Sequence, residues 1–228
     1  MSEDATELPS LSRDGDVFTL HLGDGENRFN PSRNDALLSA LQEVEATPAP
    51  RALVTAATGK IWSYGLDLEW LGAHQDSVQE AVDQYHRLLA EFLSAGVPTV
   101  AAVQGHNFAA GAMFAAAHDY VVMRADRGFW CLPEVDLGLP FTPGMTALLQ
   151  ARLTPQAAHE AMATGRRFGG TDAERAGIVN RAVAEEEVLH VAVARAKELA
   201  DKNPATLRAI KERMYADALR ALRATQQL

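Results

Sequence analysis

Short apolar runs alternate with helically spaced apolar positions through the first part of the chain. The runs predict strands at residues 17–22, 51–56, 98–103 and 120–123. Apolar residues three or four positions apart predict helices over 31–45 and about 77–95, and Pro31 suits the first turn of the earlier one. This alternation is typical of an α/β fold in which helices cover a sheet.

Beyond Gly144 the pattern changes to one helix after another. Segments 154–156 and 171–174 read as N-terminal caps, and residues 177–183 form a single strand-like interruption. Residues 185–228 predict two Ala-rich helices broken at Asn203-Pro204. We therefore predict one domain over residues 1–228, with an α/β core to about residue 184 and a helical C-terminal subdomain over about 185–228.

Composition narrows the class of protein. With 47% apolar and 22% charged residues in 228, the chain is typical of a soluble globular domain, and its net charge of −9 argues against a nucleic-acid partner. The single cysteine, Cys131, excludes an internal disulfide and fits a reducing compartment. The acidic residues 1–7 lack the parts of a secretory signal, and no apolar run reaches membrane-spanning length. These features predict a cytoplasmic protein without a membrane partner.

The segment from Leu132 to Leu139 sets Glu134 among apolar residues, shortly after a turn of small residues at 108–112. A carboxylate enclosed by apolar groups loses hydration, so its pKa rises and it becomes a better base. Side chains as small as those of the turn let backbone N–H groups approach a ligand oxygen, and the helix expected at 109–117 opens there. Together they suggest proton transfer beside an oxyanion site. Taken separately, each feature also fits an ordinary structural role. Glu134 could be a solvated acid in an edge turn, and the small residues could serve tight helix packing.

Three blocks of this sequence, in order, resemble the crotonase superfamily, the enoyl-CoA hydratase/isomerase family. Residues 59–68 are similar to the family's loop ending in Ser-x-Gly-x-Asp-Leu, 103–111 to its turn opening a helix, and 132–139 to its Pro-Glu-x-x-x-Gly segment. Residues 171–183 then resemble its Ala-x-x-x-Gly-Ile-Val block. The resemblance runs from about Val17 to Arg213 and implies the family's ββα-spiral core.

The same resemblance implies roles for individual residues. It gives Glu134 as the base and the backbone N–H groups of Leu66 and Ala110 as the oxyanion hole. Both donor positions carry larger residues than is common in the family, so we expect a narrow pocket. For substrate binding we expect Ser63, Gly65, Trp62, Gly111 and Phe141.

One departure from the family pattern favours an isomerase. Hydratases of the family carry a second glutamate at the position of Met113, which cannot activate water. A single glutamate suits the transfer of one proton from C2 to C4 of a 3-enoyl-CoA, and residues 124–129 also look like the short plant-type Δ3,Δ2-enoyl-CoA isomerases. The resemblance further implies fatty acid β-oxidation, an acyl-CoA substrate whose coenzyme A is no separate cofactor, no metal, and a homo-oligomer, trimer or hexamer.

Two alternatives stay open from the sequence. One is another crotonase reaction with one acid, namely hydration, thioester hydrolysis or decarboxylation. The other is a non-catalytic acyl-CoA-binding paralogue.

Several further residues carry two interpretations each. Asp136 could add a second carboxylate beside the base, although a salt bridge is its ordinary role. His106 could polarise a substrate or be a structural histidine, and Cys131 fits packing because no activating base is evident beside it. Asp67 is expected to cap or anchor its loop. Trp70 could line the acyl pocket, and Lys60 and Arg28 could meet the CoA phosphates or simply be solvated.

Overall fold

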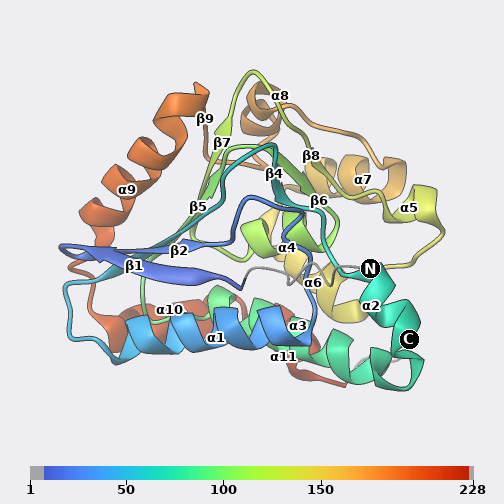
Figure 1. Cartoon of the computed structure of the whole chain (residues 1–228), viewed down its shortest axis with the longest axis horizontal. Coiled ribbons are helices and arrows are strands. Elements are labelled where there is room, and N and C mark those ends of the chain that lie inside the picture. The colour runs from blue at the N-terminus through green and yellow to red at the C-terminus, as the bar shows by residue number, and fades with distance from the viewer. Residues whose placement is uncertain (1–7, 226–228) are drawn as a thin grey trace, which may run out of the picture.

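The computed structural model describes residues 8–225 and contains two β-sheets (Figure 1). The larger sheet has the strand order β1-β2-β3-β5-β7-β9, in which β1 is antiparallel to β2 and the later pairs are parallel. Its strands are β1 Ser10–Asp14, β2 Val17–His21, β3 Ala52–Ala56, β5 Thr99–Val103, β7 Tyr120–Arg124 and β9 Arg181–Val183. The smaller, parallel sheet contains β4 Ile61–Ser63, β6 His106–Phe108 and β8 Trp130–Cys131.

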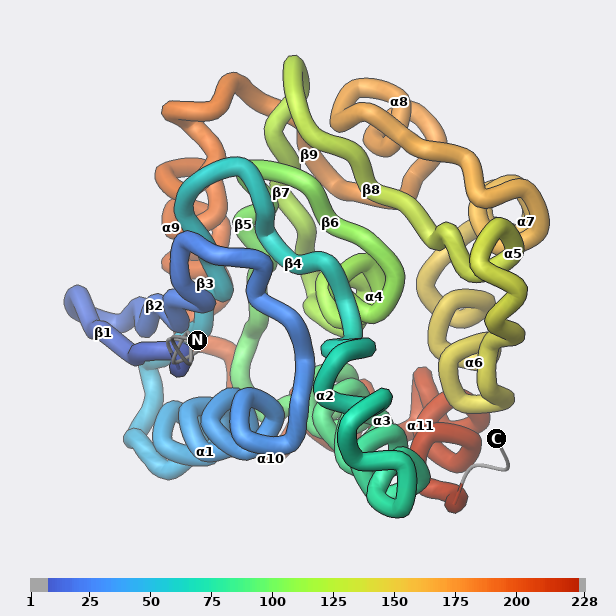
Figure 2. Tube along the Cα trace, turned by 45° about the vertical axis from the view of Figure 1, so that its right-hand side comes forward, coloured from blue at the N-terminus to red at the C-terminus, as the bar shows by residue number. Residues whose placement is uncertain are grey.

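The chain winds as a spiral of ββα turns. Each turn gives one strand to the larger sheet, one to the smaller sheet and then a helical stretch, so that β3, β5 and β7 become neighbours and β4, β6 and β8 do too (Figure 2). The helical stretches are α2 Leu68–Ala73 with α3 Val78–Leu93, α4 Ala110–Ala116, and α5 Glu134–Leu137 with α6 Pro143–Arg152. This confirms the α/β fold and the ββα spiral expected from the sequence.

The first two long helices form where the apolar spacing predicts them. Helix α1, Pro31–Ala46, begins with Pro31 in its first turn, and the Asn30 side chain caps it by accepting from Arg33 N–H. Helix α3 buries one continuous apolar stripe that includes Tyr85, Leu88 and Phe92. Helix α4 is buried on all sides, which its small residues permit.

The C-terminal part contains more helices than the sequence predicts. Three follow residue 185, namely α9 Val188–Leu199, α10 Pro204–Met214 and α11 Ala216–Arg223. The break between the last two falls at Tyr215, whose backbone is not helical and whose ring lies 5.5 Å from the Arg152 guanidinium. Helix α9 packs on β3, β5 and β7, and α11 packs on α3 and α6, so these helices complete the layers around the sheet.

Two further local features differ from the sequence-based expectations. Helix α7, Pro155–Thr164, has the predicted Thr154 cap, but α8, Gly170–Arg175, starts one residue before the predicted cap Thr171. Gly170 lies so close to the Arg124 carbonyl that a Cβ there would clash, at 2.1 Å. Strand β1 was not predicted because residues 10–14 are mostly polar and exposed.

Nothing in the described part of the chain is a helix long and apolar enough to span a membrane. The acidic residues 1–7, on which the expectation about a secretory signal rests, lie outside the described residues.

An ion pair between a buried lysine and a partly buried aspartate ties the C-terminal helices to the larger sheet. Lys211 of α10 is 3% exposed and donates to Asp119 at 2.7 Å and to the Val97 carbonyl at 3.4 Å. The same carboxylate accepts from the N–H of Thr99, at the start of β5. Burial lowers the pKa of Lys211, and the charge of Asp119 opposes that shift.

We predict that Asp119→Ala lowers the free energy of unfolding by about 3 kcal/mol, because it leaves the Lys211 charge buried without its partner. Chemical denaturation checks this value. Asp217→Ala is the matched control, since Asp217 pairs with Arg220 at a fully exposed surface, and it should change the free energy by less than about 0.5 kcal/mol. Equal effects of the two substitutions would contradict the prediction.

Candidate active site

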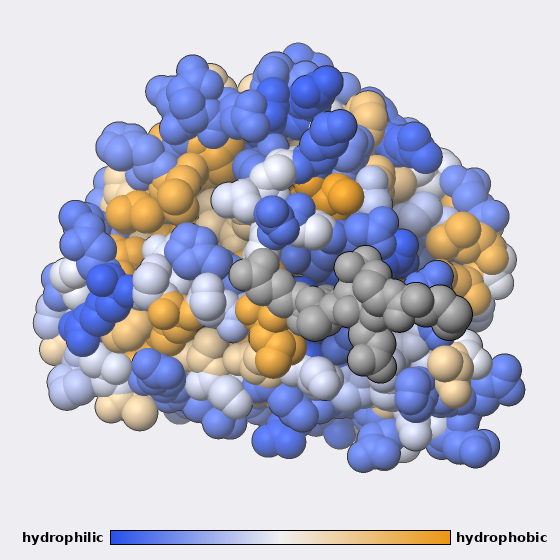
Figure 3. Space-filling view, in the orientation of Figure 1, coloured by the Kyte–Doolittle hydropathy of each residue, from blue (hydrophilic) through white to orange (hydrophobic). Residues whose placement is uncertain are grey.

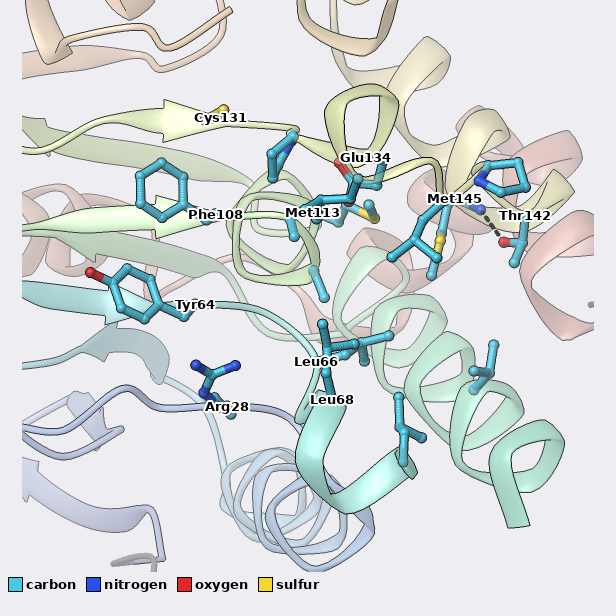
Figure 4. Close-up of a pocket in the computed structure, with 18 of the residues that line it drawn as sticks. Arg28, Tyr64, Leu66, Leu68, Phe108, Met113, Cys131, Glu134, Thr142 and Met145 are labelled. Carbon is cyan, nitrogen blue, oxygen red and sulfur yellow. Dashed lines mark hydrogen bonds between the residues drawn. The ribbon is translucent and has the colours of Figure 1, made fainter. Parts of the chain in front are cut away.

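A cavity of about 420 Å³ lies where α2, α4, α5 and α6 meet the end of the smaller sheet (Figure 4). Most of its wall is apolar, and Glu134 is its one carboxylate among the residues that the structure describes. The lining residues are Arg28, Tyr64, Leu66, Leu68, Leu71, Val82, Phe108, Ala109, Ala110, Met113, Cys131, Pro133, Glu134, Leu137, Leu139, Pro140, Thr142, Met145 and Arg167.

Glu134 opens the short helix α5 directly after Pro133. Its residue is 8% exposed, and Oε2 is buried without a hydrogen-bond partner among the described residues. Figure 4 shows the carboxylate beside Met113, with Met145 close by. Desolvation by this apolar wall raises the pKa of Glu134 to about 7, opposed by a hydrogen bond from its own backbone N–H. A carboxylate of this kind can both accept and return a proton near neutral pH.

Ala110 presents an unpaired N–H at the first turn of α4. No acceptor for it exists among the described residues, while the preceding carbonyl, of Ala109, accepts from Met113 N–H. Ala109 has a φ of +52°, a strained conformation for a residue with a Cβ. The N–H that follows this strained turn belongs to the first residue of the helix, at the cavity wall that Ala109 and Ala110 form.

Leu66 presents the second unpaired N–H. The backbone of Phe29 brackets it, since Phe29 N–H donates to the Gly65 carbonyl at 2.8 Å and the Phe29 carbonyl accepts from Asp67 N–H at 2.9 Å. The N–H between these two bonds has no acceptor among the described residues, and Leu66 lines the cavity.

Two glycines allow the Leu66 and Ala110 segments to approach each other. A Cβ on Gly65, whose φ is +89°, would lie 3.0 Å from Ala110 N and 3.0 Å from the Phe108 carbonyl oxygen. A Cβ on Gly111 would lie 2.8 Å from both Cβ and the carbonyl oxygen of Ser63. Larger residues at either position would push the two N–H groups apart.

Ser63 holds the same loop from within. Its hydroxyl donates to the Asn27 carbonyl at 2.8 Å and accepts from Gly65 N–H at 3.1 Å. Ser63, Gly65 and Gly111, expected to bind substrate, are not part of the cavity wall; they support the residues that are.

Cations and aromatic rings gather at one side of the cavity. The rings of Tyr64 and Phe108 stack at 5.5 Å, with the Arg28 guanidinium 6.0 Å from the first and that of Arg167 5.8 Å from the second. Figure 4 shows Arg28, Tyr64 and Phe108 together, across the cavity from Glu134. Lys60 instead lines a separate polar hollow with Arg124 and Arg127.

The large aromatic residues expected at the acyl pocket lie elsewhere. Trp62 is 0% exposed and stacks on Phe114 at 5.8 Å, so it belongs to the core and its predicted place on the pocket wall is corrected. Phe141 packs half-buried against the core between the two lining residues Pro140 and Thr142. Trp70 stacks on His74 at 4.2 Å, outside the cavity wall.

The two other acidic candidates, Asp67 and Asp136, lie away from the cavity wall. Asp67 caps α2 by accepting from Trp70 N–H at 3.0 Å, and it also accepts from Asn30 at 3.2 Å, as expected of an anchor. Asp136 is exposed and does not line the cavity, because the segment is helical rather than extended, and it takes part in none of the ion pairs of residues 8–225.

The cysteine fits its structural interpretation, whereas the Nδ1 atom of the histidine is buried without a hydrogen-bond partner among the described residues. His106 stacks on Phe108 and lies outside the cavity wall, and its pKa is lowered by burial and by the charges of Arg167 and Arg127. Cys131 lines the cavity, but burial raises the pKa of its thiol to about 11, so it is not an activated nucleophile.

Sequence reasoning missed most of the apolar wall and one buried tyrosine. Leu68 and Leu71 of α2 and Val82 of α3 line the cavity with residues of α5 and α6. Their spacing carries only the signal of an amphipathic helix, which does not tell a pocket wall from a core. Tyr85, in the same stripe of α3, donates its hydroxyl hydrogen to the Ala110 carbonyl.

Comparisons with known proteins agree on one family. The family model described as enoyl-CoA hydratase/isomerase matches residues 16–228. Among curated proteins, the chain is similar to enoyl-CoA delta isomerase 2, peroxisomal, of Arabidopsis thaliana, with 37% identity over 205 residues that cover 85% of each chain.

Solved structures agree with the fold. An enoyl-CoA isomerase of Mtb superposes with a TM-score of 0.87 and 28% identity, covering 95% of both chains. An enoyl-CoA hydratase of Mycobacterium marinum gives a TM-score of 0.87 and 28% identity, covering 96% of both chains. The fold is therefore shared by proteins named for either reaction.

The raised pKa of Glu134 predicts how stability depends on pH. Between the ordinary pKa of 4.5 and about 7 the unfolded chain loses this proton first, so folding must take it up and stability falls as pH rises through this window. Glu134→Gln removes the effect. Its stability relative to the native chain should rise by about 3 kcal/mol between about pH 4.5 and about pH 8 in denaturation experiments. Glu43→Gln, at an exposed position of α1, is the control and should show no such rise.

Proposed function

The chain belongs to the enoyl-CoA hydratase/isomerase family, and from that membership we propose that it is a Δ3,Δ2-enoyl-CoA isomerase of fatty acid β-oxidation. The observation that carries this proposal is the cavity itself, whose apolar wall holds one desolvated carboxylate together with two residues that have unpaired backbone N–H groups. The similarity to a curated enoyl-CoA delta isomerase supports the same reaction.

The proposed reaction needs one base and one site for negative charge. The Glu134 carboxylate removes a proton from C2, and the electron pair of that C–H bond forms a C1–C2 double bond while the thioester oxygen becomes negative. The N–H groups of Leu66 and Ala110 stabilise this dienolate oxygen. The same carboxyl group then returns the proton to C4, which restores the thioester carbonyl and leaves the double bond between C2 and C3.

A free carboxylate oxygen suits a base that must serve two carbons. Oε2 of Glu134 is not fixed by any donor among the described residues, so this oxygen can serve both C2 and C4 without first giving up a hydrogen bond. A hydratase must also hold a water molecule. Here the cavity offers Met113 in place of a second carboxylate, and the Thr142 hydroxyl is engaged by His86 and by Met145 N–H.

The two sides of the cavity suit the two ends of an acyl-CoA. Arg28 and Arg167, beside the Tyr64 and Phe108 rings, are suited to the phosphates and the adenine base of coenzyme A. Leucines and methionines on the other side suit the acyl chain. Coenzyme A is then part of the substrate, and the proposed chemistry uses neither a metal nor another cofactor.

Two properties of the whole protein complete the proposal. We propose a homo-oligomer, a trimer or hexamer, and exposed apolar residues support it. Val135 and Leu137 of α5 are about half exposed, and Figure 3 shows an apolar patch at the right, where Figure 1 places α5. The single, buried Cys131 supports a reducing compartment, for which we propose the cytoplasm, whereas the similar Arabidopsis thaliana protein is named peroxisomal.

The test follows conversion of 3-hexenoyl-CoA to 2-hexenoyl-CoA by ultraviolet absorbance. We expect Glu134→Gln to lower kcat by at least about a thousandfold, because the amide cannot take the C2 proton. Substrate labelled with deuterium at C2 should deliver part of its label to C4, since one carboxyl group carries the proton both ways. Activity should rise with pH through about 7, as Glu134 loses its proton.

Hydration of 2-hexenoyl-CoA, measured alongside, separates the alternatives. Hydration faster than isomerisation would replace the proposal with a hydratase. Tight binding of both thioesters without turnover would replace it with a non-catalytic acyl-CoA-binding protein. Asp136→Asn is the control, since this neighbouring acid lies outside the cavity wall and its loss should leave kcat within about twofold.

A further inference from the structure

A buried tyrosine contacts the segment that carries the Ala110 N–H and, through Phe29, is linked to the segment that carries the Leu66 N–H. Tyr85 of α3 is 0% exposed, and its hydroxyl donates to the carbonyl oxygen of Ala110. A buried phenol needs an acceptor. The acceptor here belongs to the residue whose own N–H is unpaired and lies at the cavity wall.

The ring of Tyr85 packs on Phe29, whose backbone is hydrogen-bonded to the other segment. Its centroid lies 5.1 Å from that of Phe29, whose ring is also buried. The Phe29 backbone forms the two hydrogen bonds that bracket Leu66, one to the Gly65 carbonyl and one from Asp67 N–H. The Tyr85 side chain is thus linked to both N–H groups. Its hydroxyl bonds to the carbonyl of Ala110, and its ring packs on Phe29, which brackets Leu66.

We propose that Tyr85 is a positioning residue that fixes the separation of the Leu66 and Ala110 N–H groups. The inference rests on the proposed function, in which these groups hold the dienolate oxygen. Tyr85 is absent from the cavity wall, so it acts through the two backbone segments and not on the substrate. Burial and the charge of Glu134 raise the pKa of Tyr85 well above its ordinary value, so the phenol stays a donor throughout the neutral range.

Removing the hydroxyl should affect turnover more than binding. Tyr85→Phe keeps the ring on Phe29 but frees the Ala110 carbonyl, so the first turn of α4 can shift. Donors aimed at developing charge matter most in the transition state, and small displacements weaken them there. We expect kcat for 3-hexenoyl-CoA to fall about tenfold while KM changes less than about twofold.

A spectroscopic probe reports on the same donors without turnover. The conjugated thioester 2,4-hexadienoyl-CoA should absorb at longer wavelength when bound, because hydrogen bonds to its carbonyl polarise the chain of double bonds. Tyr85→Phe should reduce this shift by at least half. Tyr120→Phe is the control: Tyr120 lies on β7, with its ring 5.1 Å from the Arg195 guanidinium, outside the cavity wall, and should keep native kcat and shift.

Unchanged kcat and an unchanged spectral shift in a folded Tyr85→Phe protein would overturn the proposal. A loss of kcat that matches the unfolded fraction, measured by circular dichroism, would overturn it as well. If Tyr85→Phe does not fold, Phe29→Leu tests the same link from its other end. It should lower kcat and the shift together, and native values for both would overturn the proposal.

The probe also separates this proposal from the proposed function. A native protein that shifts the dienoyl spectrum but does not isomerise 3-hexenoyl-CoA would count against the isomerase. If Tyr85→Phe then loses the shift, the positioning role still stands.

Discussion

The close approach of two backbone segments is the constraint on which the rest of the site depends. The loop after β4 and the first turn of α4 touch at Gly65 and Gly111, where added Cβ atoms would lie within 3.0 Å of the opposite segment. No side chain supplies the two oxyanion donors of the proposed reaction, so their geometry can only come from backbone packing. The glycines, the Ser63 hydroxyl and the strained Ala109 turn all serve that packing.

The apolar wall provides the second part of the chemistry, because it offers the ionised Glu134 carboxylate few stabilising interactions. Glu134 keeps a pKa of about 7 because the wall around it gives the ionised form few compensating interactions. Met113 contributes to this effect and also excludes a partner that could fix water. Met113 thus favours both a strong base at Glu134 and the proposed isomerisation. A carboxylate in place of Met113 would change the pKa of Glu134 and could fix a water molecule.

The sequence predicted the elements whose signals are local. Apolar runs located β2, β3, β5 and β7, and helical spacing with a proline at the first turn located α1. Strand β1 was not predicted because its polar residues pair at an edge. The break at Tyr215 was not predicted either, and there the Tyr215 ring contacts Arg152 of a distant helix. Such contacts join residues far apart in the chain, so no window of sequence contains them.

The residues of the candidate site also fall into those that a local sequence signal identified and those that only contacts in the fold reveal. Glu134, Leu66 and Ala110 could be singled out because a family motif marks each of them, and all three lie at one cavity. Trp62 was misplaced because a large aromatic side chain suits a pocket wall and a core equally well, and only its contact with Phe114 decides. Tyr85 carried no motif, and its position in an apolar helical stripe concealed its hydroxyl. The residues that reasoning from sequence finds least well are therefore those that hold the backbone donors in place, because their role exists only in the contact between segments.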